Sequence, residues 1–249
     1  MALKSKIEWT NSTWNPVTGC TKISSGCKNC YAERMALRLQ AAHNPSYNNG
    51  FKLTLHERSL FLPLKWRKPQ TIFVNSMSDL FHEDVPDEFI INVFNIMNQA
   101  SWHRFQILTK RSKRLLELSP RLNWAANIWM GVSVEDSEHM YRINQLRQTE
   151  AIIKFISFEP LLGLIPDIDL NDIGWVIAGG ESGPFARPME SQWAISIRNQ
   201  CQNFAVPFFF KQWGGVQKKK TGRELEGRTW DEMPTVGTLD PLITLGFKI

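Results

Sequence analysis

The chain has 249 residues, of which 43% are hydrophobic, and this is enough for one large domain or two small ones. It contains no run of eighteen apolar residues, which excludes a membrane-spanning helix, and its first residues lack the apolar stretch of a signal peptide. We therefore expect a cytoplasmic protein without a membrane partner. The 29 basic and 24 acidic residues give a net charge of +5, which permits contact with nucleic acid without requiring it.

A short apolar run at residues 7–9 predicts a first strand, and a cysteine-rich loop (residues 20–30, the cysteine loop) follows it. Three of the four cysteines stand there within eleven residues, as Cys20-x6-Cys27-x2-Cys30. In a reducing compartment such a cluster favours a metal centre over disulfides. Three thiolates can hold three irons of a [4Fe–4S] cluster and leave the fourth iron open to a substrate or cofactor.

The alternative is a zinc site with one further ligand. Zinc usually takes paired Cys-x2-Cys or Cys/His ligands, and only one such pair is present, so iron–sulfur is favoured. The fourth zinc ligand would be His43, His82 or Cys201.

From residue 71 onwards, apolar runs alternate with helical patterns. The runs occupy residues 71–75, 105–108, 128–132, 152–156, 175–178 and 206–210. Such continuous β-branched and aromatic runs are typical of strands buried on both faces. Between them, residues 89–100, 140–146 and 189–201 carry apolar stripes at helical spacing. Cys201 continues the last stripe, which makes it a buried core thiol in preference to a ligand.

This alternation predicts the fold class, which is α/β with right-handed βαβ units and a parallel sheet. Seven candidate strands favour a (β/α) barrel of the TIM type, partial or near-complete, over an open doubly wound sheet. The barrel is expected to span residues 1–213, with an insertion at about 42–70, and residues 214–249 form a C-terminal extension. Both irregular stretches are expected over or beside the barrel mouth, where substrate-contacting loops usually lie.

The three-cysteine loop after the first strand of a parallel barrel resembles the radical S-adenosylmethionine (SAM) superfamily. More narrowly, six ordered motifs resemble a phage-associated three-Cys-motif family, whose gene often lies beside that of a dedicated partner protein. The motifs lie at residues 19–33, 73–81, 108–111, 131–135, 158–161 and 179–182, and the match covers about residues 5–215. The usual spacing of the superfamily is Cys-x3-Cys-x2-Cys, so this chain has three more residues in the first gap. Asn29 stands where an aromatic residue commonly packs near the adenine, a role that the resemblance would pass to Tyr31.

The resemblance implies that the open iron binds the amino and carboxylate groups of SAM. Reductive cleavage of SAM, with an external electron donor, then yields a 5′-deoxyadenosyl radical that abstracts hydrogen from a substrate. The implied cluster ligands are Cys20, Cys27 and Cys30. The implied SAM contacts are Ser76, Ser78 and Asp79 to the amino group, Lys110 or Arg111 to the carboxylate, Ser133 and Glu135 to the ribose, and Gly179, Gly180 and Glu181 beside the adenosine.

Several of these residues have a second interpretation. Glu135 and Glu181 would also suit the first turn of a helix, where the dipole favours acids. The basic stretch at residues 110–114 would suit a solvated face or a phosphate contact. Glu159 is expected in the pocket because a charge that ends a buried strand needs a reason. His82 is either a core residue or a substrate contact, and Lys211 and Trp213 would face the substrate.

The expected function is therefore that of a radical SAM enzyme. Phage association, the basic charge and a tryptophan-rich mouth favour a nucleic acid or nucleotide as substrate, in modification or repair, with a peptide of the partner protein as the second choice. The alternative is a non-catalytic iron–sulfur module that binds nucleic acid or acts as a sensor with a partner protein.

Overall fold

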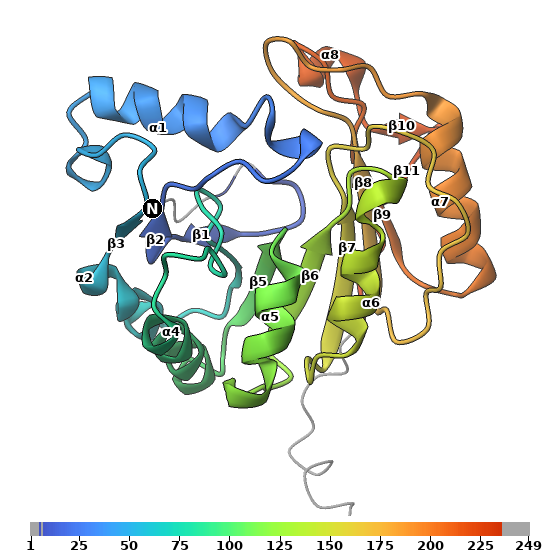
Figure 1. The fold of residues 1–249 in the computed structure, drawn as a ribbon. Helices are drawn as coiled ribbons and strands as arrows, with labels where there is room; N and C mark the ends of the chain where they lie inside the picture. The colour runs from blue at the N-terminus through green and yellow to red at the C-terminus, as the bar shows by residue number, and fades with distance from the viewer. Residues whose placement is uncertain (1–4, 6, 236–249) are drawn as a thin grey trace, which may run out of the picture.

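The computed structural model describes residue 5 and residues 7–235. Its centre is a sheet of seven parallel strands that curls into a half barrel (Figure 1). The spatial order is β1 (Ser12–Trp14), β4 (Thr71–Val74), β5 (Arg104–Thr109), β6 (Ile128–Ser133), β7 (Ile153–Phe158), β8 (Trp175–Gly179) and β9 (Phe208–Gln212). Spatial order follows chain order, as consecutive βαβ units require. The predicted α/β fold with a partial parallel barrel is confirmed.

Helices connect the strands and cover one face of the sheet (Figure 1). The longer ones are α1 (Tyr31–Ala41), α4 (Asp87–Gln99), α5 (Ser112–Leu118), α6 (Tyr141–Arg147) and α7 (Ser191–Asn203). The short elements are α2 (Glu57–Leu60), α3 (Leu62–Lys65), α8 (Lys218–Thr221), and the 3₁₀ turns η1 (Ser25–Cys27), η2 (Pro45–Tyr47), η3 (Ser119–Arg121) and η4 (Ser137–His139). None of the helices in the described part of the chain is long and apolar enough to cross a membrane.

Both faces of the sheet are buried, which explains why the strands appear as continuous apolar runs. Side chains such as Met130 point towards the helices and join the main core. Their neighbours on the opposite face form a second, mainly aromatic cluster inside the half barrel. Its members are Trp9, Phe73, Trp129, Phe155, Trp175, Ile177 and Phe209.

The first strand was predicted at the wrong place. Residues 7–9 form a turn, and β1 begins at Ser12. Trp9 packs its ring against Phe73 inside the half barrel, at 4.7 Å between ring centroids. In the sequence, an apolar residue that lies in a turn and packs inside the barrel looks the same as a residue of a short buried strand. β1, in contrast, contains two buried hydroxyl residues that interrupt its apolar run.

The insertion at residues 42–70 is divided between the two ends of the sheet. Its first part lies beside the cysteine loop, because the backbone N–H of Cys20 donates to the carbonyl of Phe51 at 3.2 Å. The insertion then supplies β3 (Thr54–Leu55), which pairs with β2 (Val17–Thr18), and then α2 and α3. The carbonyls of Pro63 and Trp66 accept hydrogen bonds from the rings of His103 (3.1 Å) and Trp102 (2.8 Å). Both donors directly precede β5, so α3 lies at the amino ends of the strands, opposite the mouth.

The described part of the C-terminal extension lies along β9. It contains α8 and the hairpin of β10 (Glu224–Leu225) and β11 (Arg228–Thr229). Trp230 is buried, its carbonyl accepts a hydrogen bond from the backbone N–H of Phe210 at 2.8 Å, and Asp231 pairs with Phe209. The segment thus covers the free edge of the sheet beside the barrel, which protects an otherwise open strand. Residues 236–249 of the predicted extension lie outside the described residues.

Candidate active site

The cysteine loop connects β2 to α1 and lies across the carboxyl ends of the central strands. Polar residues that follow β5, β6 and β8 each contact it. In a parallel α/β sheet this end carries binding and catalytic sites, because the loops after each strand converge there. The three links are Arg111 with Cys20, Ser24 with Glu135, and Asn29 with Glu181.

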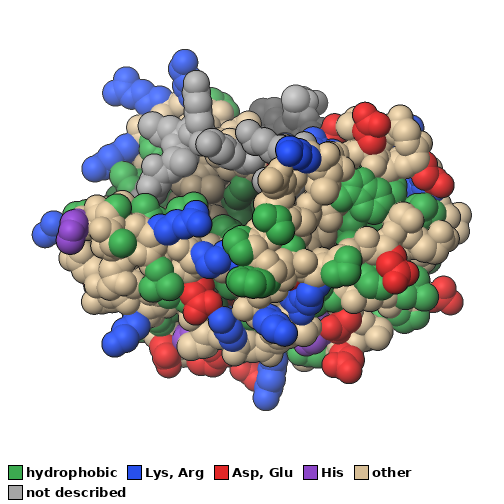
Figure 2. Space-filling view, turned by 90° about the horizontal axis from the view of Figure 1, so that it is seen from above, with side chains coloured by type: hydrophobic (Ala, Val, Ile, Leu, Met, Phe, Trp, Pro, Cys, Tyr) green, Lys and Arg blue, Asp and Glu red, His purple; other side chains and the backbone are tan. Residues whose placement is uncertain are grey.

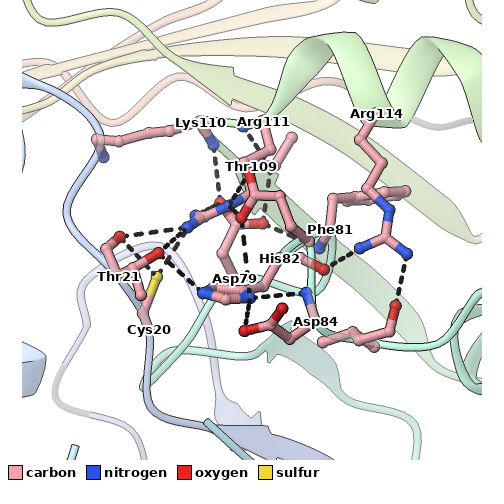
Figure 3. A network of polar contacts seen from close by, with 12 residues as sticks. Cys20, Thr21, Asp79, Phe81, His82, Asp84, Thr109, Lys110, Arg111 and Arg114 are labelled. Carbon is pink, nitrogen blue, oxygen red and sulfur yellow. Dashed lines mark hydrogen bonds and ion pairs between the residues drawn. The ribbon is translucent and has the colours of Figure 1, made fainter. Parts of the chain in front are cut away.

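The link to β5 is a buried arginine (Figure 3). Arg111 donates from Nε to both carboxylate oxygens of Glu83, at 3.0 and 2.8 Å. Its Nη1 lies 3.4 Å from Sγ of Cys20, and its Nη2 donates to the carbonyl (3.2 Å) and hydroxyl (2.9 Å) of Thr21. The planar fork of the guanidinium serves several acceptors at once, as a lysine would not. Arg111 therefore fixes the start of the cysteine loop to the end of β5.

Asp79 supports the same network. Its Oδ1 accepts from the backbone N–H of Phe81 (3.0 Å) and from Oγ1 of Thr109 (2.7 Å). Its Oδ2 accepts from the backbone N–H of Lys110 (3.0 Å) and from Nη1 of Arg111 (3.2 Å). A carboxylate offers about four acceptor positions, and here the chain itself fills them. The predicted contact of Asp79 with a SAM ammonium group therefore has no support in this geometry.

The link to β6 is a buried ion pair. Oε2 of Glu135 lies 2.6 Å from Nη1 of Arg142, and the side chains are 0% and 1% exposed. Oε1 accepts the hydroxyl hydrogen bond of Ser24 from the cysteine loop. Gly26 packs directly on this carboxylate, since a Cβ there would lie 2.4 Å from Cγ of Glu135. Glu135 precedes η4 and is not in a helix first turn, so that interpretation is wrong.

The link to β8 is a second closed ion pair. Arg187 donates to both oxygens of Glu181, at 2.6 and 2.9 Å, and Asn29 of the cysteine loop adds a bond of 2.9 Å. Burial on its own would raise the pKa of Glu181. The hydrogen bonds from Arg187 and Asn29 outweigh this effect and lower the pKa to about 2. Glu181 lies ten residues before α7 begins at Ser191, so it is not a helix first-turn residue either.

Three arginines donate to backbone carbonyls of the cysteine loop. The loop contains only the single turn η1, so most of its carbonyls need partners from elsewhere. Sequence reasoning missed this role, because no spacing or motif marks which arginines turn inwards. The pairs are Arg111 with Thr21 (3.2 Å), Arg187 with Ser25 (3.0 Å) and Arg34 with Asn29 (3.0 Å).

The predicted hydroxyl contacts also bond within the chain. Oγ of Ser76 donates to Asn15 at 3.1 Å, and Oγ of Ser78 donates to the carbonyl of Val17 at 2.8 Å. The hydroxyl of Tyr31 donates to the carbonyl of Ser76, while its side chain stays exposed. These bonds join the end of β4 to the segments on either side of the cysteine loop.

The glycines after β8 have an internal explanation. A Cβ at Gly180 would lie 2.0 Å from the carbonyl oxygen of Trp213, and one at Gly179 would lie 2.9 Å from Oε1 of Glu159. Glu159 itself pairs with Lys211 at 2.9 Å. The backbone of Trp213 therefore requires a glycine at position 180, whatever binds beside it. At Gly179 the near atom is the end of the Glu159 side chain, which could move aside.

The basic stretch at residues 110–114 is divided between scaffold and surface. Arg111 is buried and Arg114 pairs with Asp87, so the solvated-face interpretation is wrong for these two. Lys113 is exposed, and Lys110 lines a cavity of about 400 Å³ between α5 and α6. The carbonyl of Ser133, at the end of β6, accepts from Arg142.

The thiols of the cysteine loop are half-buried, whereas Cys201 is a core residue, as predicted. Burial raises the pKa of the Cys20 thiol to about 11, with Asp79 adding to the rise and Arg111 opposing it. His82 is buried and its ring nitrogens bond to Thr21 (2.9 Å) and to a backbone N–H (3.1 Å), so it belongs to the scaffold. Across residues 7–235, no group of three or more His, Cys, Asp or Glu is already placed to hold a metal ion.

The tryptophans do not gather at the mouth as predicted. Trp213 does follow β9, but it is partly buried and packs against the main core, as do Trp66, Trp124 and Trp193. Trp9, Trp14, Trp129, Trp175 and Trp230 are buried in the cores. The exposed Trp102 precedes β5, at the amino ends of the strands.

Fold and site together define a parallel α/β half barrel with a three-cysteine loop clamped across the carboxyl ends of its strands. The chain belongs to the family described as "Protein of unknown function (DUF5131)", whose model matches residues 4–234. The resemblance to a phage-associated family stays a prediction.

No curated protein matches the chain. Among solved structures, it is similar to "Spore photoproduct lyase complexed with dinucleoside spore photoproduct", with a TM-score of 0.41 and 11% identity over 74% of this chain. The match spans 59% of that chain. This similarity is too low to transfer an activity.

Proposed function

We propose that the protein is a radical SAM enzyme whose [4Fe–4S] cluster is held by Cys20, Cys27 and Cys30, and that it acts on a nucleic acid or nucleotide. The supporting observation is the position of the three thiols. They lie on one loop that is tied to the ends of β5, β6 and β8, where parallel α/β enzymes carry their chemistry.

The donor set fits such a cluster chemically. Three thiols come from one loop. Of the candidates for a fourth protein ligand, Cys201 lies in the core and His82 in the Arg111 network. The third, His43, is exposed and follows the far end of α1, which begins directly after Cys30. Three sulfur donors without a fourth suit an iron–sulfur cluster with one open iron better than a closed zinc site. Because the thiols are not yet placed as a metal site, we infer that they draw together when the cluster is assembled.

When bound, the cluster would pass an electron from an external donor to SAM and thereby generate a 5′-deoxyadenosyl radical. The chain would contribute binding groups around it. Lys110 supplies a cation beside the loop for the SAM carboxylate. The exposed ring of Tyr31 follows Cys30 directly and would pack near the adenine. Glu135 and Glu181 would act mainly by holding the loop, and Ser133 by accepting a hydrogen bond from Arg142.

Anaerobic reconstitution tests the proposal. We expect about four irons per chain and a [4Fe–4S] Mössbauer spectrum. Cys27→Ala should abolish 5′-deoxyadenosine formation from SAM and reductant. Cys201→Ala, a matched control in the core, should retain both the cluster and the product. Zinc without iron in the reconstituted protein, or unchanged turnover in Cys27→Ala, would refute the assignment.

One observation favours the second candidate, a non-catalytic iron–sulfur module that works with a partner protein. The carboxylates of Asp79, Glu135 and Glu181 all have partners within the chain, so fewer groups remain for SAM. Calorimetry with SAM separates the two, since a module without catalysis has no need to bind it.

A further inference from the structure

Phe185 has an unusual position at the rim of the site. Its side chain is 87% exposed, more than any other large hydrophobic side chain in the described residues. Its backbone φ of 63° lies in the left-handed region, which is uncommon for an aromatic residue. The ring makes no contribution to the hydrophobic core, and the positive φ costs conformational energy. Strained residues of this kind concentrate at functional sites.

The segment that carries Phe185 is held firmly at both ends. The ion pair of Glu181 with Arg187 brackets it, and Asn29 of the cysteine loop donates to the carbonyl of Phe185 at 2.9 Å. On the other side, the backbone N–H of Gly183 donates to the carbonyl of Gly215 at 3.0 Å. The ring is therefore held out from the rim, directly beside the loop that carries the cysteines.

The cysteine loop, which contacts this rim, is basic, and so is the segment that follows Gly215, the other contact of the rim. Residues 21–29 contain no acid and two lysines, of which Lys28 is exposed and Lys22 pairs with Glu33 at 2.8 Å. Residues 216–223 contain four Lys or Arg and no acid. Figure 2, which views the molecule from above, shows Lys and Arg side chains over the left and central parts of the face. Acidic side chains lie mainly towards the right and the lower edge.

An exposed aromatic ring among cations fits a nucleic acid better than a protein. Bases stack on such rings while the cations meet phosphates. A specific protein interface needs roughly 800 Å² on each partner, with an apolar centre. Here the two neighbouring segments add Ile23 and Val216 as exposed apolar residues, which is far from such an area.

We infer that Phe185 is a base-stacking residue of a single-stranded nucleic-acid contact at the rim of the active site, with Lys28 and Lys220 facing the phosphates. The inference deepens the proposed function by narrowing the substrate to a single-stranded nucleic acid. It rests on the proposed function only where it says that the bound strand is the substrate of the reaction. Binding itself requires neither SAM nor reductant.

The test is the binding of a fluorescein-labelled single-stranded oligonucleotide to the cluster-loaded full chain, measured by anisotropy at fixed salt. Phe185→Ala should weaken binding by about 5-fold to 150-fold, as expected for the loss of one stacked base. Phe185→Gly should weaken it equally, and its backbone suits the positive φ, so loop strain is not the cause. Phe185→Trp should retain binding. Phe204→Ala, which removes a ring that is 46% exposed at the end of α7, should leave it unchanged.

A second readout reports stacking directly. An oligonucleotide that contains 2-aminopurine should lose fluorescence on binding to the wild-type chain, and should keep it with Phe185→Ala. Lys28→Gln should weaken binding and reduce its salt dependence. Unchanged affinity in both Phe185 variants would overturn the inference, as would equal weakening by Phe204→Ala. No measurable affinity of the wild-type chain would overturn it in favour of a protein partner. Failure of SAM cleavage alone would refute the proposed function and leave this contact standing.

Discussion

Arg142→Leu tests the buried ion pair beneath the cysteine loop. The leucine removes the guanidinium that lies 2.6 Å from Glu135, and it leaves a carboxylate with 0% exposure in the core. Breaking a buried pair from one side costs about 3–5 kcal/mol, because the remaining charge is neither hydrated nor balanced. Ser24 still donates to that carboxylate, so we expect the lower end of this range. The loss is large against a typical domain stability of about 5–15 kcal/mol.

Urea unfolding of the apo protein, followed by circular dichroism, measures this loss as a lower midpoint at an unchanged slope. The control is Lys113→Ala. It removes a pair that is 3.9 Å long, in which the lysine is 83% exposed. Such a pair is worth less than about 0.5 kcal/mol. A loss below about 1 kcal/mol in Arg142→Leu would show that Glu135 is hydrated or neutral, and would return it to the predicted ribose contact.

Two further variants address the other links of the loop. Because the pKa of Glu181 is lowered from 4.5 to about 2, its contribution to the free energy of unfolding, about 3 kcal/mol, is complete above about pH 4.5 and is lost as the pH falls towards 2. Glu181→Gln should therefore flatten the dependence of the unfolding midpoint on pH in that window, and a parallel profile would contradict the assignment. Gly26→Ala should cost about 1–3 kcal/mol and lower the iron content after reconstitution, because the methyl group would lie 2.4 Å from Cγ of Glu135. Unchanged stability together with full iron content would contradict this packing.

The sheet could be predicted because burial on both faces leaves a simple trace in the sequence. β6 is an example, since each of its six residues from Ile128 to Ser133 is buried. β1 could not be found in this way. Ser12 and Thr13 are buried but polar, while Trp9 is apolar and lies in a turn. Apolar runs report burial, and only indirectly the hydrogen bonding that defines a strand.

The sequence predicted which residues lie around the cysteine loop, but not which of them contact one another. Polar residues after parallel strands must converge at one edge of the sheet, so the neighbourhood of the cysteine loop followed from strand order alone. Which of them are free to bind a ligand depends on partners that no motif marks. Glu135 and Glu181 are closed by Arg142 and Arg187, seven and six residues further along the chain. Arginine is rarely buried, so the sequence alone favours a solvated surface position for both arginines.

Hydrogen bonds that involve no metal hold the cysteine loop over the strand ends. In a small zinc domain the ligand loops have little else to hold them, and metal binding supplies the free energy of folding. Here charge-assisted hydrogen bonds from the arginines near the ends of β5 and β8, and from Arg34 of α1, already fix the loop at three carbonyls. The apo chain should therefore keep the loop over the strand ends. What a cluster would add is local convergence of the thiols, since their place at the mouth of the half barrel is set by the protein.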